Sequence, residues 1–218
     1  VLGVVDFDGN RLRTQDGKLP LDDLRGRVSF TREDFYGEAL TATYDGQPVG
    51  LVVTGGIGDP NYETEFRMTG TSDAARILGY VQQYAPYLHD WLARTDKLGA
   101  VSGEAPWKAV LSLPHTASGA APAAKKLRIE SSLNGLGIDL PWPFGKVAAE
   151  QKALTIETAI GSDAARTTRL AFGSALRFEL DQAKRDDTPG SGRITRADIA
   201  FGASEAAATQ PGIYLHGE

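Results

Sequence analysis

Apolar and polar residues alternate along most of the chain, as in β-strands with one buried and one solvated face. The clearest run covers residues 48–54, where Val49, Leu51 and Val53 share one face. Residues 62–69 repeat the pattern, with Phe66 among the apolar positions. The other expected strands are 4–7, 27–30, 39–44, 107–113, 127–133, 135–140, 154–160, 168–172, 175–180, 194–201 and 213–215.

Turn-forming residues separate several of these runs. Asp45-Gly46 lies between two alternating segments and predicts a tight hairpin. Gly173-Ser174 predicts a second hairpin in the same way. Asp8-Gly9-Asn10 is interpreted as a turn that ends the first strand. The pattern therefore favours strands that pair with their neighbours along the chain.

The period of the pattern changes at residue 72, and residues 72–94 predict a helical segment. Ser72 or Thr71 is expected to cap it, with Asp73 in the first turn, where the helix dipole favours an acidic side chain. Pro86 lacks an amide hydrogen, so it predicts a kink or the first residue of a second short helix. The apolar stripe of this segment consists of Ile77, Leu78, Val81, Tyr84, Leu88, Trp91 and Leu92.

These patterns predict a mostly β fold: a long curved antiparallel sheet or an open β-groove with one helical insert. Residues 1–70 and 97–218 are expected to form β-strand repeats, and residues 71–96 the insert. The chain starts in the middle of a pattern and stops just after an alternating run. We therefore expect it to be one continuous piece of a larger protein.

Composition narrows the classes of function. The 218 residues carry a net charge of −5 and a pI of about 5.3. This balance argues against nucleic-acid binding, which needs a basic patch, and against adsorption to an anionic membrane surface. Cysteine is absent, which excludes thiol catalysis and cysteine-ligated metals.

No arrangement of residues predicts catalysis, a metal site or a cofactor. Asp6, Asp8 and Asn10 have the opening spacing of a calcium loop, but Arg11 stands where the loop needs glycine. The three histidines lack metal-ligand spacing and a G-x-S-x-G motif beside them, so we interpret them as ordinary surface or boundary residues. They are His89, His115 and His216.

An ordered series of residues begins near the middle of the chain: Ser-Leu, a glycine, a short apolar strand, and then Leu-Pro-x-Pro-x-Gly-Lys. Its members are Ser132, Leu133, Gly135, Ile138, Leu140, Pro141, Pro143, Gly145 and Lys146. This series resembles the signature of the YhdP family, the large AsmA-like envelope proteins of Gram-negative bacteria. Residues 24–27, 45–49 and 211–217 are similar to the repeating strand units of the same proteins.

The resemblance implies a non-enzymatic role in moving phospholipid between the inner and outer membranes, and so in outer-membrane biogenesis. It implies a periplasmic β-groove with a dry interior, in a full-length parent anchored in the inner membrane. The implied partners are phospholipid acyl chains, neighbouring repeats of the same chain and other envelope proteins. It carries no catalytic residues over to this chain.

A sheet that leaves one apolar face open exposes more apolar area than soluble monomers ordinarily do. Acyl chains could cover such a face, at about 0.8 kcal/mol for each buried CH2 group. For each candidate the alternative is a place in a closed core. The lipid-facing candidates are Val49, Leu51, Val53, Phe66, Leu111, Ile129, Leu133, Leu154, Ile156, Phe172 and Phe178.

Two other functions stay open at this point. The first is a carbohydrate-binding β-sandwich, with Trp142 and Trp107 as stacking platforms; flat, solvent-facing rings would favour it, and buried rings would favour the conduit. The second is a hydrolase, which requires two carboxylates facing each other across a cleft.

Overall fold

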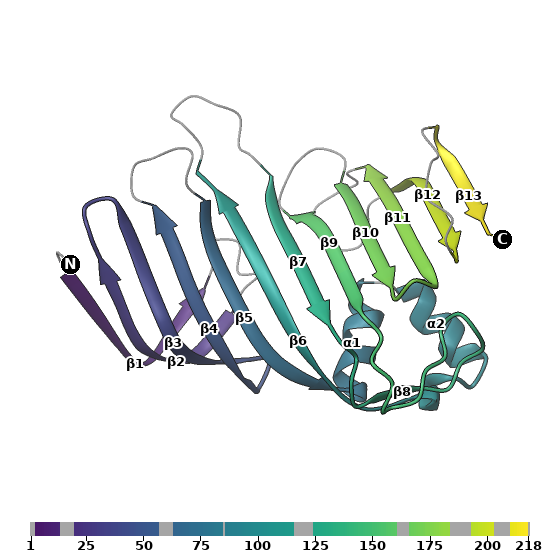
Figure 1. Ribbon diagram of the computed structural model, residues 1–218, viewed down its shortest axis with the longest axis horizontal. Coiled ribbons are helices and arrows are strands. Elements are labelled where there is room, and N and C mark those ends of the chain that lie inside the picture. The colour runs from purple at the N-terminus through teal and green to yellow at the C-terminus, as the bar shows by residue number, and fades with distance from the viewer. Residues whose placement is uncertain are drawn as a thin grey trace. The chain divides into compact units, whose positions relative to one another are not determined.

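The computed structural model describes residues 3–13, 20–56, 63–84, 86–115, 124–160, 166–183, 193–202 and 210–217. Within them the chain forms thirteen strands, two α-helices and one short 3-10 helix (Figure 1). The strands before the helices are β1 (Gly3–Arg13), β2 (Pro20–Phe30), β3 (Asp34–Tyr44), β4 (Gln47–Gly56) and β5 (Glu63–Asp73). The helices are α1 (Ala74–Tyr84), α2 (Pro86–Arg94) and the 3-10 helix Leu98–Ala100.

Eight strands follow the helices. They are β6 (Val101–Pro114), β7 (Lys125–Ser131), β8 (Leu136–Ile138), β9 (Leu154–Ile160), β10 (Arg166–Phe172), β11 (Leu176–Ala183), β12 (Arg193–Phe201) and β13 (Gly212–His216). The hydrogen-bonded order is β1-β2-β3-β4-β5-β6-β7-β9-β10-β11-β12-β13, and β8 pairs with β6 beside this path. The predicted mostly β fold, a large open sheet with a helical insert, is confirmed.

One pairing departs from the antiparallel rule. β13 runs parallel to β12, with Ala197 opposite Ile213 and Ile199 opposite Leu215. The predicted hairpins are found as expected: Asp45-Gly46 joins β3 to β4, and Gly173-Ser174 joins β10 to β11. The chain divides into two compact units, Val1–Thr71 with Lys108–Leu127, and Ser72–Trp107 with Arg128–Glu218. We call them the first and second units.

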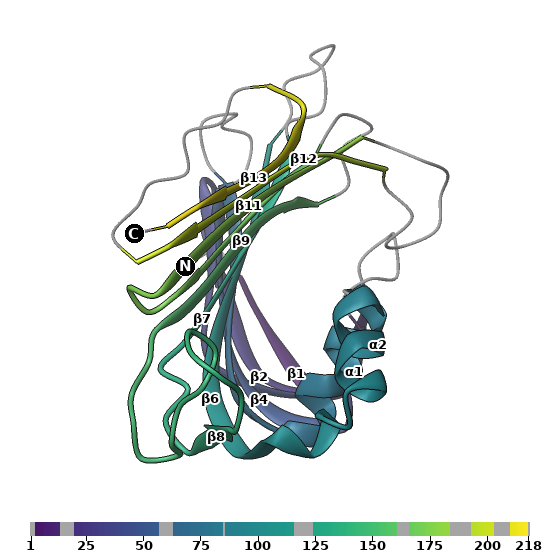
Figure 2. The same cartoon turned by 90° about the vertical axis from the view of Figure 1, so that its right-hand side faces the viewer.

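Bulges interrupt the register of the first three strands in the first unit. β1 continues through Asp8, Gly9 and Asn10, so the predicted turn at these residues is wrong. The register shifts there, and Gly9 takes a φ of 76°, because one extra residue is absorbed without ending the strand. Similar shifts with positive φ occur at Asp23 and Ala39. Bulges bend strands, and Figure 2 shows β2 and β4 curving along their length.

One face of the first unit is apolar and buried. Leu51 lies opposite Leu40 on β3 and Met68 on β5, so the three side chains share a face. The buried apolar residues of this unit are Leu21, Leu24, Val28, Leu40, Ala42, Val49, Leu51, Val53, Met68, Ala109 and Leu111.

The first residues of α1 and α2 are set by a capping side chain and by a proline. The cap of α1 is Asp73, whose Oδ1 accepts the backbone N–H of Arg76 at 2.8 Å. The expected cap at Ser72 or Thr71 is therefore wrong, since Ser72 Oγ instead accepts the indole N–H of Trp107 at 3.0 Å. Pro86 begins α2, as expected for a proline at the first helical position.

Two glycines allow β6 and the segment before β8 to touch. Gly103 and Gly135 have φ values of 85° and 93°. A Cβ on Gly103 would lie 2.2 Å from the carbonyl oxygen of Gly135, and a Cβ on Gly135 would lie 2.6 Å from that of Glu104. Beside this contact lies a core cluster of Ala105, Leu133, Leu136, Phe172 and Leu176.

Candidate functional site

The sheet of the second unit has one mostly apolar face, with Thr158, Thr168, Arg166 and Gln182 at one end of it. Residues opposite each other on neighbouring strands point to the same side of a sheet. A row across β9 to β13 therefore shares one face; it consists of Ile156, Leu170, Phe178, Ile199 and Leu215. A second row on this face consists of Leu154, Phe172, Leu176 and Phe201.

Burial of this apolar face falls toward its last strand. Phe172 and Leu176 are buried in the core cluster, while Ile156 and Phe178 are half-buried. On β13, Ile213 and Leu215 are 76% and 69% exposed. Single exposed apolar residues are ordinary on protein surfaces, but here they continue an apolar face across a strand pair.

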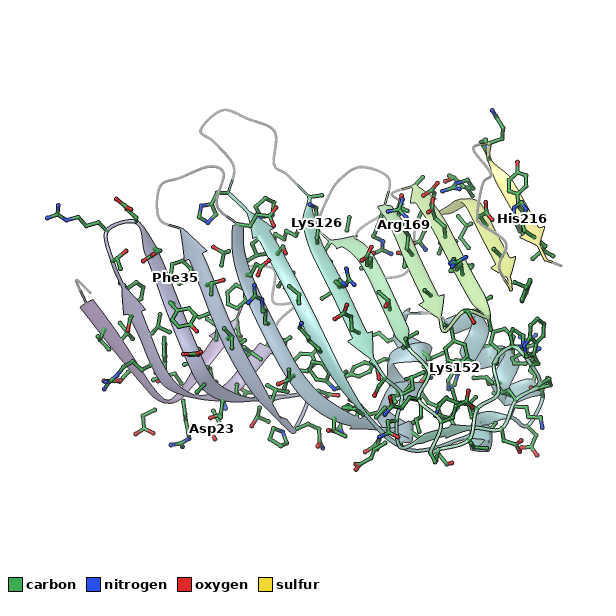
Figure 3. All side chains as sticks on the ribbon, in the orientation of Figure 1. Asp23, Phe35, Lys126, Lys152, Arg169 and His216 are labelled. Carbon is green, nitrogen blue, oxygen red and sulfur yellow. The ribbon has the colours of Figure 1, made fainter. Side chains whose placement is uncertain are left out.

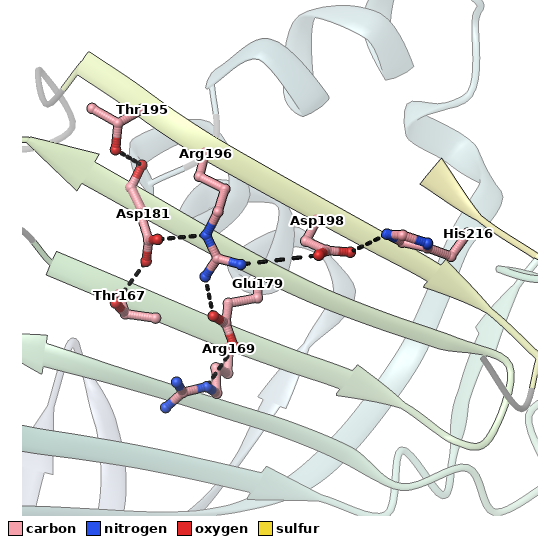
Figure 4. Close-up of polar contacts among 8 residues, drawn as sticks. All are labelled: Thr167, Arg169, Glu179, Asp181, Thr195, Arg196, Asp198 and His216. Carbon is pink, nitrogen blue, oxygen red and sulfur yellow. Dashed lines mark hydrogen bonds and ion pairs between the residues drawn. The ribbon is translucent and has the colours of Figure 1, made fainter. Parts of the chain in front are cut away.

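The opposite face of the same strands carries a closed network of charges (Figure 4). Arg196 on β12 donates from Nε to Asp181 Oδ2 at 2.7 Å and from Nη2 to Glu179 Oε1. Arg169 on β10 donates from Nε to the other oxygen of Glu179 at 2.7 Å. Thr167 Oγ1 donates to Asp181 Oδ1 at 2.7 Å. Each of these carboxylates is therefore paired on its own face.

The pairing shifts the ionisation of these groups. Burial alone would raise the pKa of Glu179, but the hydrogen bonds from Arg169 and Arg196 outweigh it and the pKa is lowered. The hydrogen bonds from Arg196 and Thr167 lower the pKa of Asp181. The same carboxylates raise the pKa of Arg196. Carboxylates held in the ionised form are poor general acids, which argues against a hydrolytic role for this cluster.

Asp198 and His216 extend the network to β13. Asp198 is fully buried, and its Oδ2 lies 3.9 Å from Nη1 of Arg196. His216 Nε2 lies 3.1 Å from Oδ1 of Asp198 (Figure 4). His216 also stacks on Tyr214, with ring centroids 6.5 Å apart. The close approach of Asp198 and His216 lies between β12 and β13 on the polar face, whereas the stack of His216 on Tyr214 lies within β13.

Two lysines secure the loop between β8 and β9. Lys146 is buried, and its Nζ donates to the carbonyl oxygens of Leu133 and Val147, both at 2.9 Å, and to that of Leu136. Desolvation lowers the pKa of Lys146. Lys152, labelled in Figure 3, lies with its Nζ 4.4 Å from the ring centroid of Phe172. The Gly-Lys end of the sequence series therefore has a structural role here.

The candidates of the first unit share its buried face. Val49, Leu51 and Val53 alternate on β4, and Phe66 lies opposite Val53. Leu111 is buried on β6. Phe66 is half-buried, while the β4 residues are almost completely covered. Their contact with lipid stays a prediction.

In the second unit, Leu154, Ile156, Phe172 and Phe178 lie together on the apolar face described above. Ile129 is half-buried on β7. Leu133 lies beyond the end of β7, in a turn with a φ of 50°, and is buried in the core cluster. It is therefore not part of the β7 face.

The two candidate tryptophans differ in how exposed their side chains are. Trp142 is 71% exposed, whereas Trp107 is half-buried and hydrogen-bonded to Ser72. A pair of flat platforms is therefore not formed. Among the described residues, no three histidine, aspartate or glutamate side chains are grouped to hold a metal ion. His115 Nε2 lies 3.0 Å from Thr64 Oγ1 on β5.

The fold and its faces define a class: an open, mostly antiparallel sheet whose last five strands have one self-paired polar face and one mostly apolar face. A comparison with protein families matches the YhdP protein family over residues 1–218, and the chain belongs to that family. The family comprises AsmA-like envelope proteins and is a lipid-transport family, not known for enzymatic activity.

Comparisons with curated proteins and with solved structures each find no match. In the part of the chain that the structure describes, neither helix has the length and apolar character needed to cross a membrane.

Sequence reasoning missed the charge network and the buried lysine. It assigned no role to Arg196, Asp181 and Glu179, because the contacts among them depend on the register of β10, β11 and β12. Alternation along β11 does place Glu179 and Asp181 on one face, and this pattern was the signal in the sequence for a shared charge cluster. Nothing in the local sequence of Lys146 indicates burial.

Proposed function

We propose that this chain is a non-enzymatic segment of a periplasmic conduit that moves phospholipid between the inner and outer membranes. Acyl chains would contact the apolar face of β9 to β13, and neighbouring repeats of the parent protein would continue the path. Membership of a lipid-transport family supports the class of cargo. An inner-membrane anchor in the parent and contacts with other envelope proteins belong to the same proposal.

The observation that carries the proposal is the five-strand apolar row of Ile156, Leu170, Phe178, Ile199 and Leu215. A row without polar groups binds hydrocarbon by burial alone, at about 0.8 kcal/mol for each CH2 group. A cargo that shifts along it breaks no hydrogen bond, so successive positions have similar free energies. Such a surface suits a sliding cargo better than a fixed ligand.

The polar face also supports the proposal that lipid binds to the apolar face. Its carboxylates and guanidinium groups are paired with one another, so this face is compatible with water and needs no ligand. On the apolar face, by contrast, the side chains at β13 are not covered by the described residues of the chain: Ile213 and Leu215 are exposed.

The test is photo-crosslinking to phospholipid from two adjacent positions on β11. A photoreactive phenylalanine analogue replaces Phe178 on the apolar face, and the same analogue replaces Arg177 on the other face as the matched control. The purified chain is incubated with phosphatidylethanolamine vesicles and irradiated, and adducts are counted by mass spectrometry. We expect lipid adducts from position 178 at several times the yield from position 177. Equal yields, or none from position 178, would overturn the proposal.

A further inference from the structure

The loop between β8 and β9 holds an exposed tryptophan in a fixed place. Trp142 stands between Pro141 and Pro143 and is 71% exposed. The N–H groups of Phe144 and Gly145 donate to the Pro141 carbonyl at 3.0 and 3.3 Å. Lys152 Nζ donates to the carbonyls of Pro143 and Gly145 at 3.1 and 3.4 Å. The exposure of the indole is therefore built into a restrained loop.

Trp142 also continues the apolar face. Its ring lies 6.5 Å from that of Phe201, centroid to centroid, at an angle of 38°. Phe201 is opposite Leu176 and packs against the core cluster that contains it. The indole thus stands at the end of the row formed by Leu154, Phe172, Leu176 and Phe201.

The indole differs from every other side chain of that row because it carries a hydrogen-bond donor. Among the described residues, none accepts a hydrogen bond from Trp142 Nε1, whereas Trp107 Nε1 donates to Ser72. Indole groups are suited to boundaries, where the ring contacts hydrocarbon and the N–H contacts a polar group. In an acylated lipid the polar group nearest the hydrocarbon is the ester carbonyl.

We propose that Trp142 is a specificity-determining residue that recognises ester-linked acyl chains. Its ring lies against the methylenes nearest the ester, and Nε1–H donates to the ester carbonyl oxygen. This inference rests on the proposed function and adds a preference that the purely apolar rows cannot supply. A chain without a carbonyl, as in an ether lipid, would have the ring contact and no hydrogen bond.

The test compares two phosphatidylcholines that differ only in linkage, dioleoyl ester and dioleyl ether. Each is offered in vesicles to the purified chain, and the lipid retained after flotation is measured. The wild type is expected to retain the ester lipid roughly two- to tenfold better, as for one neutral hydrogen bond. Trp142→Phe keeps an aromatic ring and loses the donor, so it should retain both lipids equally, at the wild-type level for the ether.

Two further variants locate the effect. Trp142→Ala should lower retention of both lipids, because it removes the ring contact as well. Trp91→Phe, a change at an exposed tryptophan on α2, should keep the wild-type preference. Matching unfolding midpoints in urea establish that the variants are folded.

The outcomes separate this inference from the function on which it rests. If the wild type binds both lipids equally, or if Trp142→Phe keeps the ester preference, the role of Trp142 is wrong and the lipid-binding function stands. If the wild type retains neither lipid, the proposed function fails and this inference fails with it.

Discussion

The two faces of the β9–β13 sheet are built from alternate residues of the same strands and end in opposite states. On one face Arg196 gathers Glu179 and Asp181, so the charges are satisfied by one another. On the other, Ile199 and Leu215 continue an apolar row onto a strand whose large side chains are exposed. One side of a sheet can thus have its polar groups paired with one another while the other side leaves large apolar side chains exposed.

The largest expected effect tests whether the charged groups of the polar face stabilise one another. Arg196→Met leaves Glu179, Asp181 and the fully buried Asp198 without their shared guanidinium group, and should cost about 3–5 kcal/mol of unfolding free energy. Arg169→Met is the matched control, because Arg169 also binds Glu179 but is mostly exposed; it should cost less than about 1 kcal/mol. Urea unfolding measures both. Equal losses would show that Arg196 is not the centre of the network.

The next effect concerns the loop that ends the apolar face. Lys146→Met removes the charged donor shared by the carbonyls of Leu133, Leu136 and Val147 and should cost about 2–3 kcal/mol. The carbonyls of Leu133 and Val147 keep the backbone N–H groups of Leu136 and Glu150, at 3.2 and 3.0 Å. Lys126→Met, at an exposed position on β7, should change stability by less than about 0.5 kcal/mol. Both values come from urea unfolding curves. A cost for Lys146→Met no larger than that of the control would contradict the structural role of the lysine.

The third prediction compares the effect of one added carboxylate on the two faces of β9. Ile156→Glu places a carboxylate on the apolar row and should lower phospholipid retention about tenfold, since hydrocarbon cannot solvate the charge. Thr155→Glu adds the same group to the other face of β9 and should leave retention unchanged. Flotation with labelled phospholipid vesicles measures both variants. Similar losses in the two variants would show that the faces are not distinguished by lipid.

The smallest expected effect is a pH dependence of stability. The pKa values of Glu179 and Asp181 are lowered in the folded chain, so their ionised forms stabilise it. Their contribution is fully present above the unfolded pKa values of about 4 and is lost as pH falls through the folded values. We expect a loss of about 1 kcal/mol below pH 4 from these groups. Unfolding curves of Glu179→Gln with Asp181→Asn should have a shallower acid slope; an unchanged slope would contradict the assignment.

Local patterns predicted the elements that local chemistry determines. Alternation placed Val49, Leu51 and Val53 on one face, and the pairing of β4 with β5 confirms that Phe66 joins them. Pro86 marked the start of α2 because its missing amide hydrogen is harmless at that position. Such features depend on neighbours in sequence, so sequence alone shows them.

Features that depend on distant partners could not be predicted. Asp8-Gly9-Asn10 has the composition of a turn, and only the pairing with β2 makes it a bulge. Ser72 is a good cap by type, but Trp107 from another strand occupies its hydroxyl. The parallel β13 and the burial of Lys146 likewise follow from the arrangement of strands and loop carbonyls.

The contact between Gly103 and Gly135 limits how this fold can vary. A side chain at either position meets backbone rather than another side chain: the carbonyl of Gly135 in one case and that of Glu104 in the other. No smaller neighbour can make room, because a backbone carbonyl cannot be trimmed by substitution. Second-site suppressors should therefore be absent at this crossing, and a library with both codons randomised should return glycine at both.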